Sequence, residues 1–305
     1  MIPIALTIIA AVWAGVAAEG RYPGRAAAAT RRALTVVLYT VLPVVVFFNL
    51  SRTDLDHNFA LGIVFGWIAV TICALLAYLV ADRLLGLSRP QTGSVICCVL
   101  VANSGALGFP LVAAVLGFDL IGEAVLFDVA VTGVALMVGA FSVGAAFGTR
   151  AGQGPRERTR AFFLRNTPLY AAALALIAPD SLAPEWAVDG SRGLIVLLLP
   201  LGFLAVGASL AEGGDGRLLN LPRSLRAAVA TVAALKLVLL PALLLLLAAP
   251  LIDLPTSFLL LAAMPSGINA MVVSQAYGLD MKITAGAVAW TTAIAVPLVL
   301  VASLV

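Results

Sequence analysis

The chain has 305 residues, of which 62% are hydrophobic and 11% are charged, and its mean hydropathy is +1.11. A soluble domain is about 45–50% apolar and about 25% charged, so these few charges cannot keep so much apolar surface in water. The composition excludes a soluble enzyme and a nucleic-acid-binding protein, although the net charge is +3. It predicts an all-α integral membrane protein whose solvent is the lipid bilayer and whose partners include no nucleic acid.

Apolar runs rich in Leu, Ala and Val follow one another along the sequence. Within each run the apolar residues are continuous and do not alternate with polar ones, which favours helices over the strands of a membrane barrel. A membrane-spanning helix needs about 20 such residues, and on this basis we predict ten transmembrane helices. They are residues 2–18, 33–50, 59–81, 92–116, 123–147, 162–178, 191–211, 225–249, 255–277 and 282–304.

The basic residues predict how these spans are oriented. With ten spans and the N-terminus outside, 15 of the 18 Lys and Arg residues lie on the inner side, in loops or at the inner ends of spans, 2 lie on the outer side and Lys236 lies well within a span. Cytoplasmic loops carry an excess of Lys and Arg. We therefore expect a multi-pass protein of the cell membrane, with both termini outside and loop 148–161 in the cytoplasm.

The fourth and ninth predicted spans share a weak sequence repeat. Residues 103–110 begin with Asn-Ser-Gly and end in Pro, and residues 265–269 have the sequence Pro-Ser-Gly-Ile-Asn. Each half of the chain would hold five spans, an odd number, so the second half would enter the membrane inverted, as in many secondary transporters. We predict one repeat at 1–150, a basic cytoplasmic loop at 151–161, and the inverted repeat at 162–305.

Helix-breaking residues lie in both of these spans. They are Gly108 and Pro110 in the fourth span and Pro265 and Gly267 in the ninth. They predict interruptions near 103–110 and 264–269, because such residues disturb the helical hydrogen bonds. Broken backbone at membrane depth is tolerated only inside protein or beside a water-filled cavity, so two matched breaks predict a binding site where the spans cross. The alternative is that each break is a kink for packing.

Polar residues beside the two breaks are the candidate substrate ligands. Helix N-termini present unpaired N–H groups and partial positive charge, and amides and hydroxyls donate further hydrogen bonds to an anion. Each Asn has the alternative role of capping its half-helix. The candidate substrate-binding residues are Asn103, Ser104, Gly105, Ser266 and Asn269, with Ser209 as a lesser candidate because such hydroxyls often bond their own backbone.

Two charged residues lie five or more residues from the ends of their predicted spans, at a depth where a charge costs at least about 2.5–3.5 kcal/mol. Lys236 lies about ten residues into the eighth span, and it either offsets the carbonyl ends of the broken helices or supplies a substrate or coupling charge. Asp128 lies five residues into the fifth span. It is either an interfacial carboxylate or the group that a coupling ion, H⁺ or Na⁺, neutralises.

The crossover motifs resemble those of the auxin efflux carrier family. The similarity rests on residues 103–110, on Phe127-Asp128, on 207–210 and on 264–270 with 276–280, in this order along the whole chain. Where the family often has Asn three residues after the fifth-span Asp, this chain has Val131, followed by Thr132.

This resemblance implies the fold of bile-acid/sodium symporters and a homodimer. In that fold a scaffold of spans 1, 2, 6 and 7 flanks a transport domain of spans 3–5 and 8–10, whose broken helices cross. Bacterial members are typically permeases for small carboxylates such as malate or malonate, and plant members export auxin.

The predicted function is a secondary active transporter that moves a small organic anion by alternating access. The alternative is a sodium/bile-acid-like symporter or a cation/proton antiporter of the same fold. The sequence contains no catalytic motif and no cluster of metal ligands, so we expect no enzymatic activity, no metal site and no cofactor beyond the coupling ion.

Overall fold

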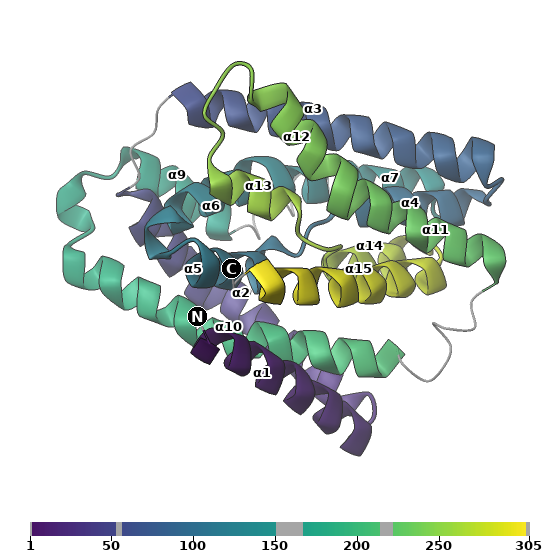
Figure 1. Cartoon of the computed structure of the whole chain (residues 1–305), viewed down its shortest axis with the longest axis horizontal. Helices are drawn as coiled ribbons and strands as arrows, with labels where there is room; N and C mark the ends of the chain where they lie inside the picture. The colour runs from purple at the N-terminus through teal and green to yellow at the C-terminus, as the bar shows by residue number, and fades with distance from the viewer. Residues whose placement is uncertain (1, 53–56, 151–166, 214–221, 303–305) are drawn as a thin grey trace.

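The computed structural model describes residues 2–52, 57–150, 167–213 and 222–302, and within these ranges the chain is helical, without a β-sheet (Figure 1). The α-helices are α1 (Ile2–Arg21), α2 (Arg25–Leu50), α3 (His57–Leu79), α4 (Arg89–Leu100), α5 (Phe109–Val115), α6 (Ile121–Phe127), α7 (Phe141–Phe147), α9 (Thr167–Ile177), α10 (Glu185–Gly213), α11 (Arg223–Ala233), α12 (Leu240–Ala248), α13 (Thr256–Ala262), α14 (Asn269–Tyr277) and α15 (Met281–Ala302). Five π-helical segments continue or interrupt them: η1 (Val80–Leu84), η2 (Ser104–Gly108), η4 (Asp128–Thr132), η5 (Ala135–Ala140) and η7 (Ala234–Leu239). Two short 3-10 segments are η3 (Phe118–Leu120) and η6 (Asp180–Leu182).

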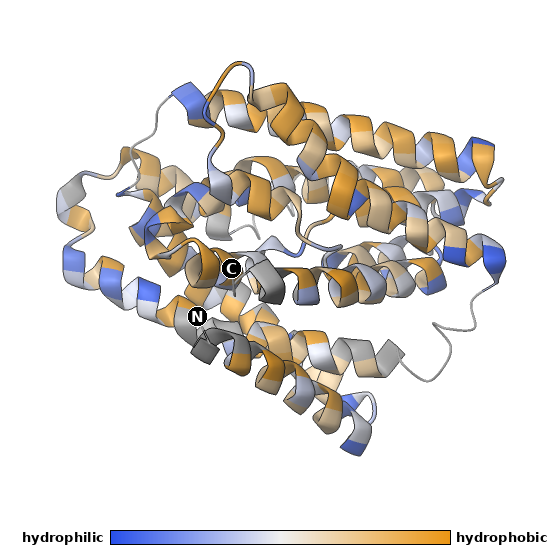
Figure 2. Cartoon of the chain, viewed as in Figure 1, coloured by the Kyte–Doolittle hydropathy of each residue, from blue (hydrophilic) through white to orange (hydrophobic). Residues whose placement is uncertain are grey.

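Several of these helices have the length and composition of membrane spans. In the described part of the chain, four helical stretches are long and apolar enough to cross a bilayer: His57–Leu84, Phe118–Phe147, Glu185–Ala208 and Arg223–Ala248. Apolar residues run along these helices, and hydrophilic residues gather at several of their ends (Figure 2). The all-helical membrane protein is therefore confirmed, whereas the count of ten spans and their inverted arrangement stay predictions. Loop residues 151–161, and residues 162–166 that open the sixth predicted span, lie outside the described residues.

Helices α1 and α10 lie along one edge of the molecule, and α3 and α12 lie along the opposite edge (Figure 1). The contact between α1 and α10 depends on two glycines. A Cβ on Gly15 would lie 2.1 Å from the Leu204 carbonyl oxygen, and one on Gly207 would lie 2.0 Å from the Val12 carbonyl oxygen. The two helices therefore touch along their backbones. The division of the chain into scaffold and transport domains stays a prediction.

The segments of the fourth and ninth predicted spans lie between these two edges, in the buried core. There the ring of Phe127 lies 4.7 Å from that of Phe258, centroid to centroid, which fixes α6 against α13. On the other side, α10 approaches η2 so closely that a Cβ on Gly202 would lie 2.1 Å from the Ala106 carbonyl oxygen. The broken helices are thus held between packed aromatic rings and a backbone contact with α10.

Candidate functional site at the crossing of two broken helices

The fourth predicted span is interrupted just after α4. The helix stops at Leu100, residues 101–103 are not helical, and the chain resumes in η2 and α5. The interruption lies earlier than the breakers Gly108 and Pro110, which are both in the resumed helix. Pro110 stands in the first turn of α5, directly after the π-helical turn η2, so its missing N–H falls where the hydrogen bonding changes from π-helical to α-helical.

The ninth predicted span is interrupted where its sequence indicates. Helix α13 stops at Ala262, residues 263–268 are irregular, and α14 begins at Asn269. Pro265 and Gly267 lie inside this irregular stretch. The irregular stretch 263–268 overlaps the range 264–269 that the sequence indicates.

The two irregular stretches lie against each other and exchange backbone hydrogen bonds. Ala102 and Ser266 form an antiparallel bridge. The Asn103 N–H donates to the Pro265 carbonyl at 2.9 Å, and the Gly267 N–H donates to the Val101 carbonyl at 2.9 Å. Each break thus satisfies backbone groups that the other leaves free, as a membrane interior requires.

The two serines of the crossing have different partners. Ser266 is fully buried; its hydroxyl donates to the Cys98 carbonyl at 2.8 Å, and its N–H donates to the Thr291 hydroxyl at 3.1 Å. Ser104 is also buried, and its hydroxyl donates to the Asp128 carboxylate. Both hydroxyls are therefore used inside the protein.

The amide side chains differ in exposure. Asn103 precedes η2 and is only 7% exposed, whereas Asn269, the first residue of α14, is exposed. Gly105 is half-buried within η2. Among these five candidate ligands at the crossing, Asn269 alone presents an exposed side chain. The sixth candidate, Ser209, lies in α10, and its side chain is outside the described part of the structure.

Asp128 joins the fifth predicted span to the crossing. This half-buried residue opens η4, and its carboxylate accepts hydrogen bonds from the hydroxyls of Ser104 and Thr132. Thr132 Oγ1 also lies 2.9 Å from the Asp128 carbonyl oxygen and 3.4 Å from Ser104 Oγ. Sequence reasoning missed Thr132 as a site residue, although a hydroxyl four residues after an acid inside a span was the signal.

Because Ser104 starts the resumed helix, the Asp128 carboxylate lies at the positive end of that helix. Ser104, Asp128 and Lys236 all stand in π-helical segments, which occur often at functional sites.

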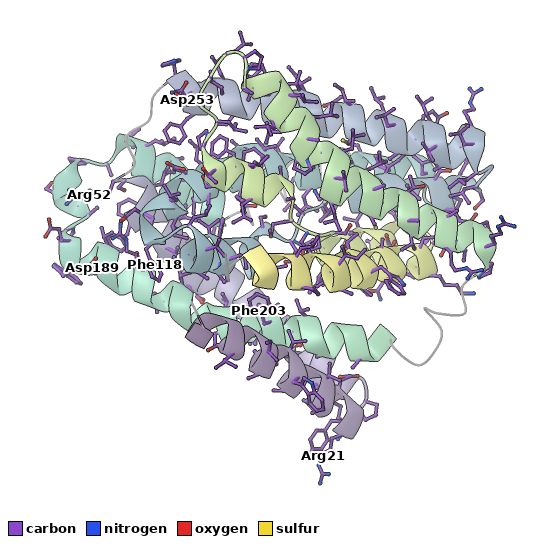
Figure 3. All side chains as sticks on the ribbon, viewed as in Figure 1. Arg21, Arg52, Phe118, Asp189, Phe203 and Asp253 are labelled. Carbon is purple, nitrogen blue, oxygen red and sulfur yellow. The ribbon has the colours of Figure 1, made fainter. Side chains whose placement is uncertain are left out.

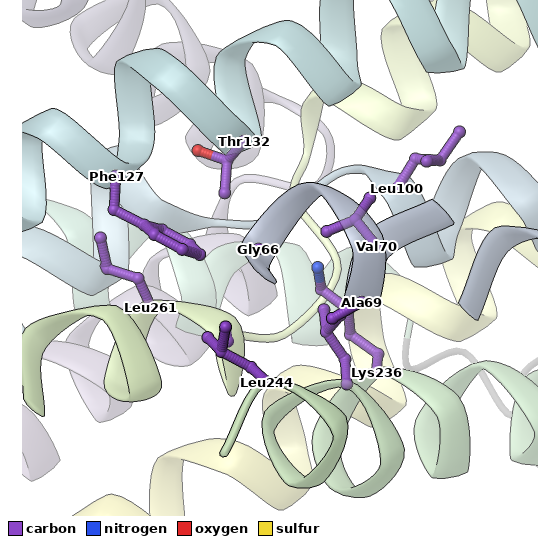
Figure 4. Close-up of a pocket in the computed structure, with 11 residues that line it drawn as sticks. Gly66, Ala69, Val70, Leu100, Phe127, Thr132, Lys236, Leu244 and Leu261 are labelled. Carbon is purple, nitrogen blue, oxygen red and sulfur yellow. The ribbon is translucent and has the colours of Figure 1, made fainter. Parts of the chain in front are cut away.

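Lys236 lies near the middle of the stretch Arg223–Ala248 and is only 1% exposed. It lines a small cavity with room for about one water molecule, and Thr132 lines a different side of that cavity (Figure 4). Leu100 and Ala262, the last residues of α4 and α13, border the same cavity. The negative ends of both half-helices therefore face the region of the lysine. In the described part of the chain, no acidic residue forms an ion pair with it.

The loops that follow the two broken helices are anchored to different partners. Asp119 in η3 pairs with Arg192 of α10 at 2.9 Å, at the end of α10 where Asp189 and Phe118 lie (Figure 3). Asp280, after α14, accepts a hydrogen bond from the Gln91 amide of α4 at 3.2 Å. The first loop is thus tied to α10 and the second to the other broken helix.

Comparison with known proteins gives two matches. A family model described as "Membrane transport protein" matches residues 1–149 and 196–303. An "Uncharacterized transporter" of Methanothermobacter thermautotrophicus is 31% identical over 144 residues, which are 47% of this chain and 45% of that protein. The match therefore spans about half the length of this relative.

Proposed function

This chain belongs to the membrane transport protein family, as the resemblance to auxin efflux carriers predicted, and from that premise we propose that it is a secondary active transporter for a small organic anion. The substrate class is a carboxylate of malate, malonate or auxin type, moved across the cell membrane by alternating access. The exposed amide of Asn269 beside the crossing is the observation that supports this proposal.

An anion fits this position for two reasons. Asn269 is the first residue of α14, so the partial positive charge of that helix start lies beside its side chain. The amide adds a hydrogen-bond donor suited to a carboxylate oxygen. In this proposal Asn269 is the substrate ligand, and the buried Asn103 supports the crossing. The hydroxyls of Ser104 and Ser266 stabilise the crossing through hydrogen bonds inside the protein.

Lys236 has a supporting role in this proposal. Its buried side chain borders a cavity where α4 and α13 both end, and a positive charge there offsets the carbonyl ends of two half-helices. Replacing Lys236 with Ala is then expected to lower the stability of the protein more than its affinity for substrate.

Alternating access needs two groups of helices that move past each other. The backbone contact between Gly202 of α10 and Ala106 of η2 lies where the predicted scaffold meets the predicted transport domain. We propose that the crossing moves along α10 at this contact. The same proposal takes the protein as a homodimer with both termini outside, and labelling of a Gln153→Cys variant only from the cytoplasmic side would test the orientation.

Uptake into proteoliposomes tests the function. Purified protein is offered a panel of labelled mono- and dicarboxylates under imposed proton or sodium gradients. We expect uptake of at least one carboxylate and its loss in Asn269→Ala, while Gln275→Ala, which removes an exposed amide near the other end of α14, retains it. Uptake that depends on sodium and is equal in both variants would instead favour a symporter with a different binding site.

A further inference from the structure

The crossing already contains an acid of its own. The Asp128 carboxylate is bonded to Ser104 at the start of the resumed helix, which is one of the two helix starts at the crossing. A substrate carboxylate bound beside the other start, at Asn269, would bring a second negative charge to the same crossing. An anion and an ionised Asp128 therefore oppose each other at this site.

We propose that Asp128 binds the coupling proton, so that the transporter takes up one proton together with its anion. This inference rests on the proposed function. On the uptake side an O–H bond forms between a carboxylate oxygen of Asp128 and a proton from hydronium. On the release side that bond breaks and the proton returns to water. The charge of Asp128 is thereby removed while the anion is bound, and no oxidant or further reactant takes part.

The hydroxyl groups around Asp128 suit both of its protonation states. When Asp128 is ionised, Ser104 and Thr132 both donate to its carboxylate. When it is protonated, Thr132 can turn its hydrogen to the Asp128 carbonyl oxygen, which lies 2.9 Å away. The hydroxyl oxygens then accept the new O–H, because a hydroxyl both donates and accepts. The cluster therefore exchanges a proton without leaving a buried group unsatisfied.

The surroundings of η4 contain few other groups that compete for the proton. On α6, Glu123 accepts a hydrogen bond from Ser257 at 2.7 Å. On α9, Tyr170 is exposed, and on α3, Cys73 is buried against the Leu235 carbonyl while His57 opens the helix. η2 and η5 carry no titratable side chain, and Lys236 lies across the cavity that Thr132 lines. No ion pair with Asp128 occurs in the described residues.

A proton also fits this cluster better than a sodium ion. A hard cation takes oxygen lone pairs from several ligands. Among the described residues the cluster offers the Asp128 carboxylate and the hydroxyls of Ser104 and Thr132, whereas a single O–H bond is enough to neutralise Asp128.

The first test measures proton movement with malonate as the probe. Proteoliposomes hold a pH-sensitive dye, no gradient is imposed, and malonate is added outside. The unchanged protein should acidify the interior, and its apparent affinity should fall by about tenfold per pH unit once Asp128 loses its proton. Asp128→Asn should exchange labelled malonate for unlabelled malonate without acidification and with a flat pH profile. Glu123→Gln, five residues earlier on the same helical stretch, should keep the coupling.

The second test does not need a substrate. Infrared spectra of the full chain in lipid, from about pH 5 to about pH 9, should contain a protonated-carboxyl band that Asp128→Asn removes and Glu123→Gln leaves. Absence of such a band overturns the inference, even if carboxylates are transported. So does malonate uptake that acidifies the interior in Asp128→Asn, or that follows sodium without proton entry. If the band is present but no carboxylate is exchanged by the unchanged protein, proton binding at Asp128 is supported and the proposed function fails.

Discussion

The two breaks that meet at the crossing are similar in sequence and different in construction. At the fourth-span break the chain continues through a π-helical segment whose first hydroxyl is bonded to Asp128, and the neighbouring Asn103 is buried. At the ninth-span break Ser266 is bonded to the backbone of α4, and Asn269 is exposed. One break therefore holds a titratable group, and the other offers a free amide.

This difference shows that the two copies of a repeated motif can have different roles within one site. The equivalent serines, Ser104 and Ser266, make different contacts because their neighbours differ: Asp128 and Thr132 stand beside the fourth span, and the Cys98 carbonyl and Thr291 stand beside the ninth. The substitutions below, in order of decreasing expected effect, test whether this division is real.

The ninth-span break depends on close backbone pairing, and Gly267→Ala should disrupt it most. A Cβ there would lie 2.6 Å from the Ala102 carbonyl oxygen, so the bridge must move apart. We expect a loss of about 3 kcal/mol in the free energy of unfolding, measured by denaturation in detergent. Gly193→Ala on α10, where a Cβ meets open space, is the control. Equal stability of Gly267→Ala and the parent would contradict the pairing.

Substitutions of Asn269 and Asn103 should distinguish substrate binding from stabilisation of the crossing. Asn269→Ala removes a hydrogen bond to a charged ligand, so affinity for the transported carboxylate should fall by about ten- to a hundredfold. Asn269→Asp should weaken binding further, because it adds a negative charge. Asn103→Ala should lower affinity less and the thermal midpoint more, since Asn103 is buried. Isothermal titration and thermal unfolding of all three variants test this order, and reversed effects of the two Ala variants would refute it.

Ser266→Ala should affect stability without affecting transport. It removes one neutral hydrogen bond to the Cys98 carbonyl, a loss of about 1 kcal/mol. Ser104→Ala, which removes a donor from Asp128, should instead change the pH dependence of uptake. Parallel measurements of thermal midpoint and of uptake against pH distinguish the two serines. An altered pH profile in Ser266→Ala would contradict their division of roles.

The smallest effect is expected at the loop that follows the fourth span. Asp119 is largely exposed, so Asp119→Asn should cost at most about 0.5 kcal/mol despite the 2.9 Å contact with Arg192. The effect should vanish at high salt, which thermal unfolding in low and high salt would show. A large loss that persists in salt would mean that this loop is anchored to α10 by more than the ion pair.

Sequence reasoning predicted the local features of the site and missed those that depend on distant partners. Pro265 and Gly267 identify the ninth-span break because their own chemistry disfavours a helix. Nothing about Val101 or Ala102 indicates a break, and their stretch is irregular where it pairs with residues 265–267. The link between Ser104 and Asp128, 24 residues apart, likewise follows from packing and not from a local pattern.

The antiparallel bridge also has a consequence for how the protein is made. The Val101 carbonyl and the Asn103 N–H find their partners only in residues 265–267, which the ribosome adds more than 160 residues later. Until then these groups have no helical partner, and hydrocarbon offers none. The first half of the chain must therefore wait, with this stretch near water or another protein, until the second half has been synthesised and inserted. Completion of the crossing is a late step of biogenesis.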